Sequence, residues 1–458
     1  MKRLATALAL LALAGLVALA LVPLRQPRPR EAPRVVSAAS AAGALQAGAA
    51  TAAIEVAPGT PIAGYPRLLW ASQGVRDAPA AHALALREGG LTVAVASADI
   101  LLVPPELRRR VESRLADLKL GALLLAATHT HSGPGGYWDD FLGGRIATGP
   151  YHRRHEEAVA AAVEAAVRGA VTSLGPARLA VGSARLQALS RNRNGGEVDG
   201  RLLVLRATRA GDVAAPGRAL APAEVGGAPP PVIGQVVVFP AHATILSSRN
   251  RLLSSDWPGA LARELPGTTV FLQGAIGDQS VQREGGVPDP ETYARSLATE
   301  IARLPFGPAD AAPPLGAALV EVALPAPSFG AVPRVLDRLA SNLLHDWLPA
   351  RASVLAIRAG PALLAAVPAE PGGEVGRRWR AALGPDAEVV SLAGGYLGYV
   401  ETPQKVRDRS GEAVRTYLGP DLAFALGDGL VVAAGALAAA PSGGPDAPPL
   451  APAGGTRR

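Results

Sequence analysis

The chain of 458 residues contains no cysteine. Disulfide bonds, cysteine nucleophiles, lipid-modified cysteines and thiolate metal sites are therefore excluded, and any metal ion must be held by His, Glu, Asp or Tyr. Histidine is also scarce, with seven in the whole chain. Histidines that fall close together in such a sequence are therefore strong indicators of a functional site.

Lysine is nearly absent, since it occurs only at positions 2, 119 and 405. The net charge of +7 thus comes from arginines, which are scattered among Ala, Gly and Pro and form no basic block interleaved with aromatic residues. A nucleic-acid groove requires such a basic face. We therefore expect a solvated arginine surface and no nucleic-acid partner.

A long uncharged run occupies residues 4–24, directly after Lys2 and Arg3. About 20 apolar residues suffice to cross a bilayer as a helix. Ala18-Leu19-Ala20 resembles a cleavage site, but the run continues past it, so residues 1–24 are either a signal peptide or a membrane anchor. In both cases we expect the rest of the chain to be extracytoplasmic, that is secreted, periplasmic or membrane-anchored.

Composition divides the remaining chain into three parts. Pro, Arg and Ala dominate residues 25–50, which we expect to form a linker, and residues 441–458 have the composition of a disordered tail. Residues 51–440 between them carry regular hydrophobic patterns, with a Gly- and Pro-rich surface insertion expected at residues 210–231. The folded domain is therefore predicted to be residues 51–440.

Strand-like hydrophobic runs alternate with amphipathic helical patterns through this domain. The predicted strands are residues 91–99, 123–127, 177–187, 202–206, 233–239, 269–272, 354–357 and 363–367. The predicted helices are residues 105–118, 151–171, 257–264 and 289–304. This alternation predicts an α/β fold of layered mixed sheets flanked by helices, in which polar residues of interest follow strand ends.

Two histidines separated by one residue, His129 and His131, follow the hydrophobic run 123–127 and precede the glycine-rich residues 132–136. Residues two apart on a strand share a face, so the two imidazoles would aim at one point. This pattern predicts a metal site at the end of a buried strand. In contrast, His152 and His155 lie three apart among charged residues, and we expect them on the solvated face of a helix.

Catalytic zinc sites use about three protein ligands and keep one position for water. Further candidate ligands follow other predicted strands, namely His242 after residues 236–239 and Glu370 after residues 363–367. Tyr399 is a less usual candidate, because a phenolate forms at neutral pH only beside a strong cation. Each residue alone has an ordinary structural explanation, but together they favour a zinc hydrolase.

Several segments resemble the neutral (non-lysosomal) ceramidases. Residues 127–136, Ala-Thr-His-Thr-His-Ser-Gly-Pro-Gly-Gly, are similar to the zinc motif of that family nearly letter for letter. The segments at residues 273–280, 367–370, 398–403 and 417–420 are similar to its Gly-Asp-Val-Ser, Val-Pro-Gly-Glu, Tyr-Val-Thr-Thr-Pro and Tyr-Gly-Pro segments, in the same order. The resemblance extends from about residue 53 to residue 435.

The resemblance implies that residues 51–440 are a zinc hydrolase domain that cleaves the N-acyl amide bond of ceramide, or of a similar N-acyl lipid, at a membrane surface. The Zn²⁺ ligands that it implies are His129, His242, Glu370 and Tyr399. The other active-site residues that it implies are His131, which would handle a proton or contact substrate, Arg193 near the site, and Ser280, as nucleophile or substrate contact.

These residues are chemically consistent with amide hydrolysis. An amide is a poor electrophile, so its hydrolysis requires an activated water, a positive charge beside the developing oxyanion and an acid for the departing amine. Zinc would serve the first two needs, Arg193 would reinforce the second, and His131 is the best remaining acid. We also expect Asp99 to orient a ligand histidine from behind, and Asp278 either to do likewise or to form a turn.

The sequence departs from the family at three places. Val281-Gln282 follow the serine where the family has Pro-Asn, Glu401 replaces a threonine beside Tyr399, and Gly411 falls where the family has a second active-site tyrosine. The chain also ends where the family continues into an immunoglobulin-like domain, so we expect the catalytic part alone. These departures motivate an alternative, a catalytically degenerate lipid-binding envelope protein of the same fold.

A serine hydrolase with a Ser/His/Asp triad is a weaker hypothesis. The sequence contains no Gly-x-Ser-x-Gly elbow, and a metal accounts better for the histidines.

Overall fold

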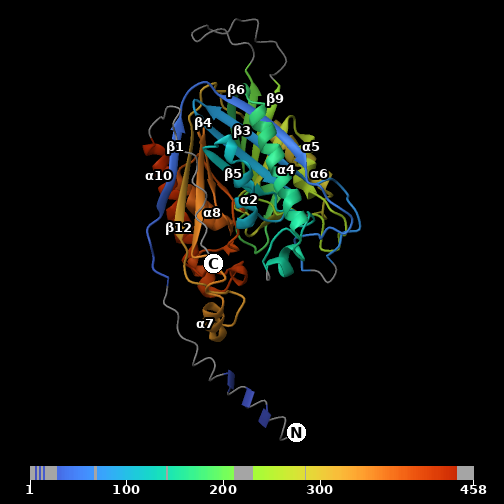
Figure 1. The fold of residues 1–458 in the computed structure, drawn as a ribbon, viewed down its shortest axis with the longest axis vertical. Helices are drawn as coiled ribbons and strands as arrows, with labels where there is room; N and C mark the ends of the chain where they lie inside the picture. Colours follow the sequence, from blue (N-terminus) through green and yellow to red (C-terminus); the bar gives the residue numbers. More distant parts are fainter. Residues whose placement is uncertain are drawn as a thin grey trace.

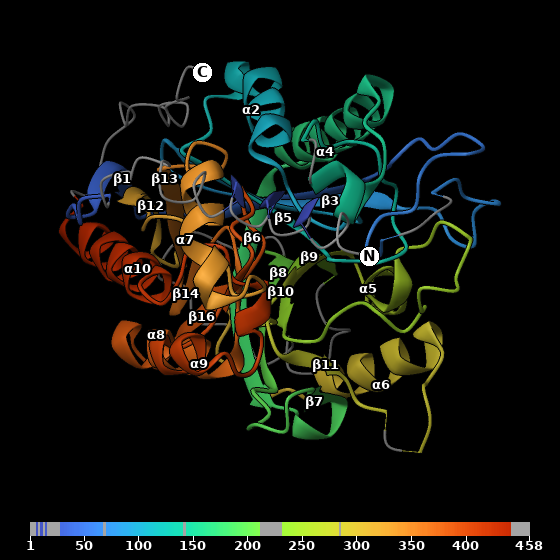
Figure 2. The same cartoon turned by 90° about the horizontal axis from the view of Figure 1, so that it is seen from below.

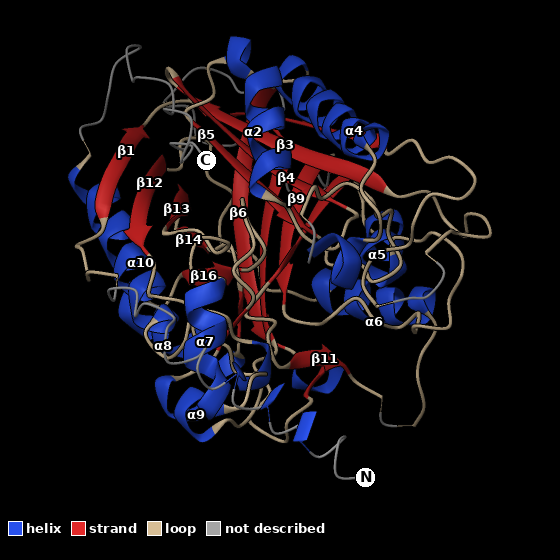
Figure 3. Ribbon diagram, turned by 60° about the horizontal axis from the view of Figure 1, so that its bottom comes forward, coloured by secondary structure: helices blue, strands red, loops and turns tan. Residues whose placement is uncertain are grey.

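A computed structural model describes residues 28–66, 70–140, 143–210, 231–283 and 285–440, together with residues 6, 7, 10, 11, 14 and 15. The predicted tail and most of the predicted insertion and N-terminal segment lie outside the described residues. Within the described parts, two large sheets stand in the middle of the molecule and helices surround them (Figures 1 and 3).

The larger sheet has eight strands in the order β10-β9-β8-β6-β2-β3-β4-β5. Its strands are β2 (Gln46–Ala53), β3 (Ala80–Glu88), β4 (Leu91–Ala98), β5 (Ala122–Ala127), β6 (Gly175–Arg185), β8 (Arg201–Arg209), β9 (Val232–Phe239) and β10 (Thr268–Gln273). Neighbouring strands are antiparallel except for the parallel pairs β4–β5 and β9–β10. Only two residue pairs join β2 to β6, and β10 also contacts β3 and β4, so the two halves of this sheet fold toward each other.

The smaller sheet has five strands in the order β1-β12-β13-β14-β16. Its strands are β1 (Arg34–Ala41), β12 (Leu315–Ala323), β13 (Arg351–Ala359), β14 (Ala362–Ala366) and β16 (Ala387–Val390). Only the pair β14–β16 is parallel. Two short pairs complete the sheets, β7 (Ser190–Asn192) with β11 (Gln279–Val281) and β15 (Glu370–Pro371) with β17 (Tyr399–Val400).

A single hydrophobic core between the two sheets joins them into one body. Leu84, Val95 and Val236 of the larger sheet and Leu319 and Ile357 of the smaller one belong to the same buried cluster. Since both sheets contribute alternate apolar residues to this layer, each sheet still has a second face to bury. Helices cover both outer faces, which gives the layered α/β architecture that the sequence predicted.

The covering helices are amphipathic segments with their apolar stripes toward the sheets. On the larger sheet they are α2 (Pro105–Arg114), α4 (Arg153–Thr172), α5 (Asp256–Glu264) and α6 (Pro290–Ala302). On the smaller sheet they are α8 (Gly373–Leu383) and α10 (Leu422–Ala439). Helices α7 (Arg334–Leu343) and α9 (Pro403–Asp408) are more peripheral, and Figure 1 shows α7 at the lower end of the molecule. Figure 2 views that end face on.

Helix α10 is long and apolar enough to span a membrane by length and composition, the one such helix among the described residues. It contacts β1, β12 and β13, and Leu426, Leu430 and Ala433 are buried against the smaller sheet. Its composition is therefore that of a helix that covers a sheet.

The prediction of a linker at residues 25–50 was wrong over most of its length, because β1 and the first half of β2 lie there. The small residues that suggested a tether allow close strand packing. β1 pairs with β12 along its length, and β2 pairs with β3. Similarly, His155 is buried and not solvated, since α4 turns that side of the helix toward the body.

Candidate metal centre

Strand ends deliver the candidate ligands to one place. His129 lies two residues after β5, His242 three residues after β9, and Glu370 begins β15 directly opposite Tyr399 of β17. The turn at His129 is tight, with φ of 62°, a left-handed conformation that is uncommon for a residue with a side chain. The backbone N–H of His129 donates to the carbonyl of Ile100 at 3.1 Å, which holds this conformation.

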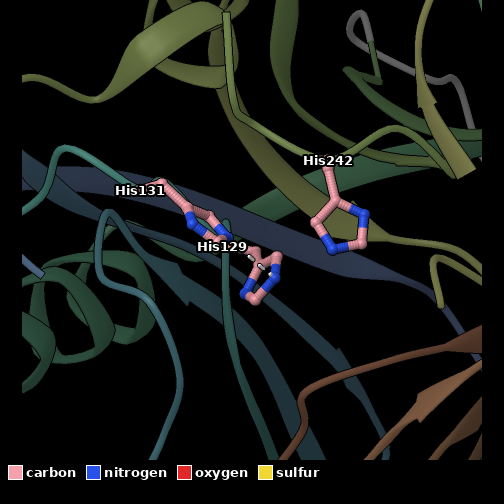
Figure 4. Close-up of side chains that lie close together, drawn as sticks. All are labelled: His129, His131 and His242. Atoms are coloured by element: carbon pink, nitrogen blue, oxygen red, sulfur yellow. Dashed lines mark hydrogen bonds between the residues drawn. The ribbon is translucent and has the colours of Figure 1, made fainter. Parts of the chain in front are cut away.

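Three imidazoles gather at the junction of these turns. The nitrogens of His129, His131 and His242 all lie within 4.8 Å of one another, and Figure 4 shows the three rings grouped around a common space. The Nε2 atoms of His129 and His131 are 3.3 Å apart. The arrangement brings together residues from both halves of the larger sheet.

Glu370 and Tyr399 close the cluster from the side of the smaller sheet. The Oε2 atom of Glu370 lies 3.4 Å from Nε2 of His129 and 3.3 Å from Nε2 of His242. The Tyr399 hydroxyl lies 3.3 Å from Nε2 of His242. All four residues predicted as zinc ligands thus converge, and His131 lies beside them.

The tautomers of two histidines follow from their backbone contacts. The Nδ1–H groups of His129 and His242 donate to the carbonyls of Leu101 and Gln279, each at 2.7 Å. Their Nε2 atoms therefore present lone pairs to Glu370, whose buried Oε2 has no hydrogen-bond partner among the described residues. A carbonyl behind each ring is the usual arrangement for metal-binding histidines.

Acceptor atoms that face one another at such distances require a cation between them. Ligand atoms about 2.0–2.2 Å from a tetrahedral Zn²⁺ are separated by about 3.3–3.5 Å, and the contacts here are 3.3–3.4 Å. Burial raises the pKa of Glu370, whereas positive charge on the side of His129 and His242 lowers it, and the resulting pKa lies well below its ordinary value. The donor set is therefore anionic and fits a divalent metal ion.

Arg193 lies against the tyrosine. Its Nη2 donates to the Tyr399 hydroxyl at 3.1 Å and to the carbonyl of Gly277 at 2.6 Å, and its Nε donates to Glu412 at 2.6 Å. Burial raises the pKa of Tyr399, and Glu370 adds to the rise, whereas Arg193 opposes it. A phenolate at this position consequently depends on a positive charge beside the oxygen.

Ser280 lies in β11, next to the support of His242. The backbones of His242 and Ser280 form a parallel bridge, and the carbonyl of the preceding Gln279 is the acceptor for the His242 ring. Ser280 is 5% exposed. The serine is therefore near the cluster by backbone position, as the sequence predicted.

Two supporting residues were missed by sequence reasoning. Gln273, the last residue of β10, donates its side-chain amide to the carbonyls of Thr128 at 2.9 Å and Ala241 at 3.0 Å, directly before two of the histidines. Tyr396 donates its hydroxyl to Oε1 of Glu370 at 2.8 Å. Gln273 begins one of the segments that resemble the ceramidases, and Tyr396 lies two residues before another, so the sequence pointed to their neighbourhood but not to their roles.

The predicted role of Asp99 was wrong. Its carboxylate accepts hydrogen bonds from the backbone N–H of Ala80 and the hydroxyl of Thr128, at 2.9 and 3.1 Å, and the carbonyl of Leu101 orients the His129 ring instead. Asp99 therefore fixes the strand end and not a ring.

Asp278 acts through its neighbours. It accepts from the Gly373 backbone N–H and from the side chains of Asn192 and Gln279, at 2.7–2.8 Å, and its carbonyl accepts from the backbone N–H of Arg193. Asp278 thereby holds the residues whose atoms contact His242 and Tyr399, but it does not contact a ligand ring itself.

Two of the departures from the family are coupled in space. Gly411 has φ of +59°, and a Cβ atom there would lie 2.6 Å from Oε1 of Glu401. The same Oε1 accepts from the backbone N–H of Glu412 at 3.1 Å, while Lys405 lies 3.2 Å from Oε2. The carboxylate of Glu401 therefore occupies the space in which a side chain at position 411 would begin.

Comparison with known proteins identifies relatives of this fold. The family model described as "Neutral/alkaline non-lysosomal ceramidase, N-terminal" matches residues 51–266. Neutral ceramidase from Pseudomonas aeruginosa is 21% identical, with a TM-score of 0.69 over 88% of this chain and 76% of that chain. A ceramidase complexed with C2 is 20% identical, with a TM-score of 0.68 over 86% of this chain and 75% of that one.

No curated protein sequence matches the chain significantly. The resemblance read from the motifs is nevertheless confirmed by two independent findings, a match of residues 51–266 to the family and a shared fold over most of the chain. Residues 51–266 thus match the neutral/alkaline non-lysosomal ceramidase family, and the chain as a whole has the fold of the neutral ceramidases.

Proposed function

We propose that this protein is a zinc-dependent amidohydrolase that cleaves the N-acyl amide bond of ceramide, or of a similar N-acyl lipid, to a fatty acid and a free amine. The observation that carries the proposal is the set of acceptor atoms from His129, His242, Glu370 and Tyr399, which face one another with no proton donor among the first three. The match of residues 51–266 to the ceramidase family supports the lipid amide as substrate.

Zn²⁺ would be held by His129, His242, Glu370 and Tyr399, and when bound it supplies a Lewis acid that lowers the pKa of a water ligand to about 7. The remaining chemistry is assigned to side chains around this set. Arg193 donates to the Tyr399 hydroxyl and keeps a positive charge beside it. That charge favours an oxyanion formed from the substrate carbonyl nearby.

His131 is the proposed proton carrier. It is half-buried, its Nε2 lies 3.3 Å from that of His129, and its ring centroid lies 4.9 Å from that of Tyr65, with the two rings tilted by 55°. A neutral imidazole at this position accepts a proton from the attacking water and returns it to the departing amine. Ser280 is proposed to contact the substrate, as nucleophile or as hydrogen-bond partner.

Residues 51–440 are proposed as the catalytic domain. β1 and the first residues of β2, which precede residue 51, belong to the same folded body. Residues 1–24 are proposed to direct this domain out of the cytoplasm, as a signal peptide or as an anchor. An extracytoplasmic location agrees with the absence of cysteine but does not depend on it.

The test is metal content together with turnover. Purified protein should contain about one zinc, and a chelator should abolish release of fatty acid from a fluorescent ceramide until zinc is restored. His129→Ala and Glu370→Ala should lose both metal and turnover. His152→Asn is the matched histidine control, because asparagine preserves the cap of α4 that His152 provides.

Zinc-loaded protein with no turnover of any N-acyl lipid would contradict the proposal. If such a protein still bound ceramide, and if His129→Ala and Glu370→Ala left this affinity unchanged, the alternative of a degenerate lipid-binding protein would be supported.

A further inference from the structure

Helix α7 presents an exposed apolar face. Leu336 and Leu343 are 43% and 69% exposed, and seven residues, about two helical turns, separate them on one face. Trp347, in the turn that follows, is 36% exposed. On the inner side, Asp337 accepts from the Ser328 hydroxyl and the Phe329 backbone N–H, at 3.0 and 2.7 Å. The helix is thus attached by these polar contacts and by packing of Ala340 and Leu344 on the core, and it directs Leu336 and Leu343 outward.

A second exposed segment adjoins α7. The indole Nε1–H of Trp347 donates to Oδ2 of Asp140 at 2.9 Å, and Oδ1 of the same carboxylate accepts from the backbone N–H of Gly143 at 2.6 Å. The short helix η2 (Gly144–Thr148) follows directly, and its Ile146 is 58% exposed. Two apolar segments, nearly 200 positions apart in sequence, therefore lie together at one end of the molecule.

This end connects to the candidate metal centre through aromatic contacts. Trp138, two residues before Asp140, packs edge-on against Tyr396 with ring centroids 6.3 Å apart. Tyr396 in turn donates to Glu370. Only these two aromatic residues separate a candidate ligand from the segment that carries Asp140 and Ile146.

The N-terminal segment joins the body at the same place. The guanidinium of Arg28 donates to four carbonyls at the C-terminal end of α7 and nearby, those of His345, Leu348, Pro349 and Pro325, at 2.7–3.1 Å. Since α7 ends at Leu343, these contacts hold Arg28 against the turn that follows the helix and carries Trp347. The uncharged run of residues 4–24 ends four residues earlier, which at full extension is about 14 Å of chain.

We propose that Leu336, Leu343, Trp347 and Ile146 form a membrane-docking face that rests on a lipid bilayer. The occupant follows from the chain itself, because a run long enough to enter a bilayer ends within about 14 Å of chain from Arg28, which contacts the carbonyls of His345 and Leu348 on either side of Trp347. Another exposed apolar pair, Phe424 and Val431 of α10, is a poorer candidate, since Asp428 lies between them and pairs with Arg30 at 3.6 Å. The docking face stands independently of the reaction proposed above.

The natural absence of cysteine makes a direct test possible. Single variants Leu343→Cys and Ile146→Cys of the full chain are labelled with an environment-sensitive fluorophore and reconstituted in phosphatidylcholine vesicles. Val287→Cys and Val431→Cys are matched controls, because these valines are 55% and 47% exposed and lie on other elements. The readout is quenching by a nitroxide attached to the lipid acyl chain, which does not involve turnover or metal.

We expect the nitroxide to quench the fluorescence of labels at 343 and 146 at least about twofold more than that of labels at 287 and 431. The reason is that an interfacial apolar face enters a bilayer by about 5–10 Å. Equal quenching at all four positions would overturn the proposal. The proposal would also be overturned if, without vesicles, the labels at 343 and 146 became shielded from solvent as the protein concentration rose. A second copy of the chain would then cover the face. Circular dichroism of each variant checks that the exposed substitutions leave the fold intact.

Discussion

At the scale of single residues, the candidate centre depends on hydrogen bonds behind the ligands as much as on the ligands. Leu101 and Gln279 fix two imidazoles through backbone carbonyls, and Tyr396 fixes the carboxylate of Glu370. All three partners orient a ligand, and the carbonyl acceptors also raise the basicity of the imidazoles, so the loss of a partner weakens metal binding without removing a ligand.

Tyr396→Phe tests this dependence. The variant removes one hydrogen bond to Glu370 and keeps the ring that packs on Trp138, so zinc affinity should fall about 10- to 100-fold while the fold is retained. Competition against a chromophoric chelator measures the affinity. Tyr151→Phe is the control, since it removes a similar hydrogen bond to Glu156, at 2.8 Å, far from the ligands in sequence. Equal affinities in Tyr396→Phe and the parent would count against this role.

A second residue-scale prediction concerns His155. Burial, with smaller contributions from Arg154 and His152, lowers the pKa of this imidazole to about 4. Its unfolded pKa is about 6.5, so the unfolded chain binds the extra proton between these values. Its contribution to stability is complete above pH 6.5 and is lost as the pH falls through about 4.

Replacing His155 with glutamine should therefore reduce the acid sensitivity of unfolding. Allowing for the ring's closeness to the surface, the difference between variant and parent should change by about 2 kcal/mol between pH 7 and pH 4. Urea unfolding at a series of pH values measures it. A pH-independent difference would show that His155 stays protonated or solvated in the folded protein.

At the scale of elements, the predicted ends of strands located the candidate ligands in the sequence. Hydrophobic runs 123–127, 233–239 and 363–367 became β5, β9 and β14, and the polar residues after them meet in space. Parallel neighbours such as β4–β5 and β9–β10 place such residues at a common edge, which explains why pattern reading located them.

Other elements could not be predicted in the same way. β1 and β2 consist largely of Ala, Ser and Gly, so their strand character arises from pairing with β12 and β3 and not from their own periodicity. Likewise, the acceptors at Leu101 and Gln279 are backbone carbonyls, which every residue has whatever its side chain, so their positions cannot be read from residue types. Sequence therefore predicted the candidate ligands but not the contacts that orient them.

The turn at Gly411 gives an element-scale prediction. Gly411→Ala should destabilise the protein by about 2 kcal/mol, because φ of +59° disfavours a side chain and the new Cβ would meet Oε1 of Glu401. Chemical denaturation measures the change. In the double variant with Glu401→Ala, part of the cost should disappear, since contacting residues couple.

Gly435→Ala is the matched control, because a Cβ there meets nothing within 4 Å and alanine favours the helix. We expect no loss of stability in this variant. Should Gly411→Ala be as stable as Gly435→Ala, the carboxylate of Glu401 does not fill the space described above.

At the scale of the whole molecule, the candidate centre ties the two sheets together. His129 and His242 follow strands of the larger sheet, whereas Glu370 and Tyr399 belong to the β15–β17 pair beside the smaller one. A cation bound by all four stabilises the native state only, because the unfolded chain holds these residues up to 270 positions apart.

Zinc should accordingly raise the free energy of unfolding by about 2.7 kcal/mol when its free concentration is 100 times the dissociation constant. Thermal unfolding with buffered zinc, and after chelation, measures the effect. Glu370→Ala should unfold at the same temperature with and without zinc. A zinc-dependent midpoint in that variant would indicate that the stabilising metal binds elsewhere.

The two-residue pair β15–β17 has a consequence for biogenesis. It forms only when residues near position 400 have reached the folding body, whereas both histidine turns are complete by about residue 280. On the proposed ligand set, a chain threaded outward from its N-terminus therefore cannot capture its cation during passage. For a chain exported in this way, metal binding would be a late event that draws on the metal ions of the compartment in which the chain folds.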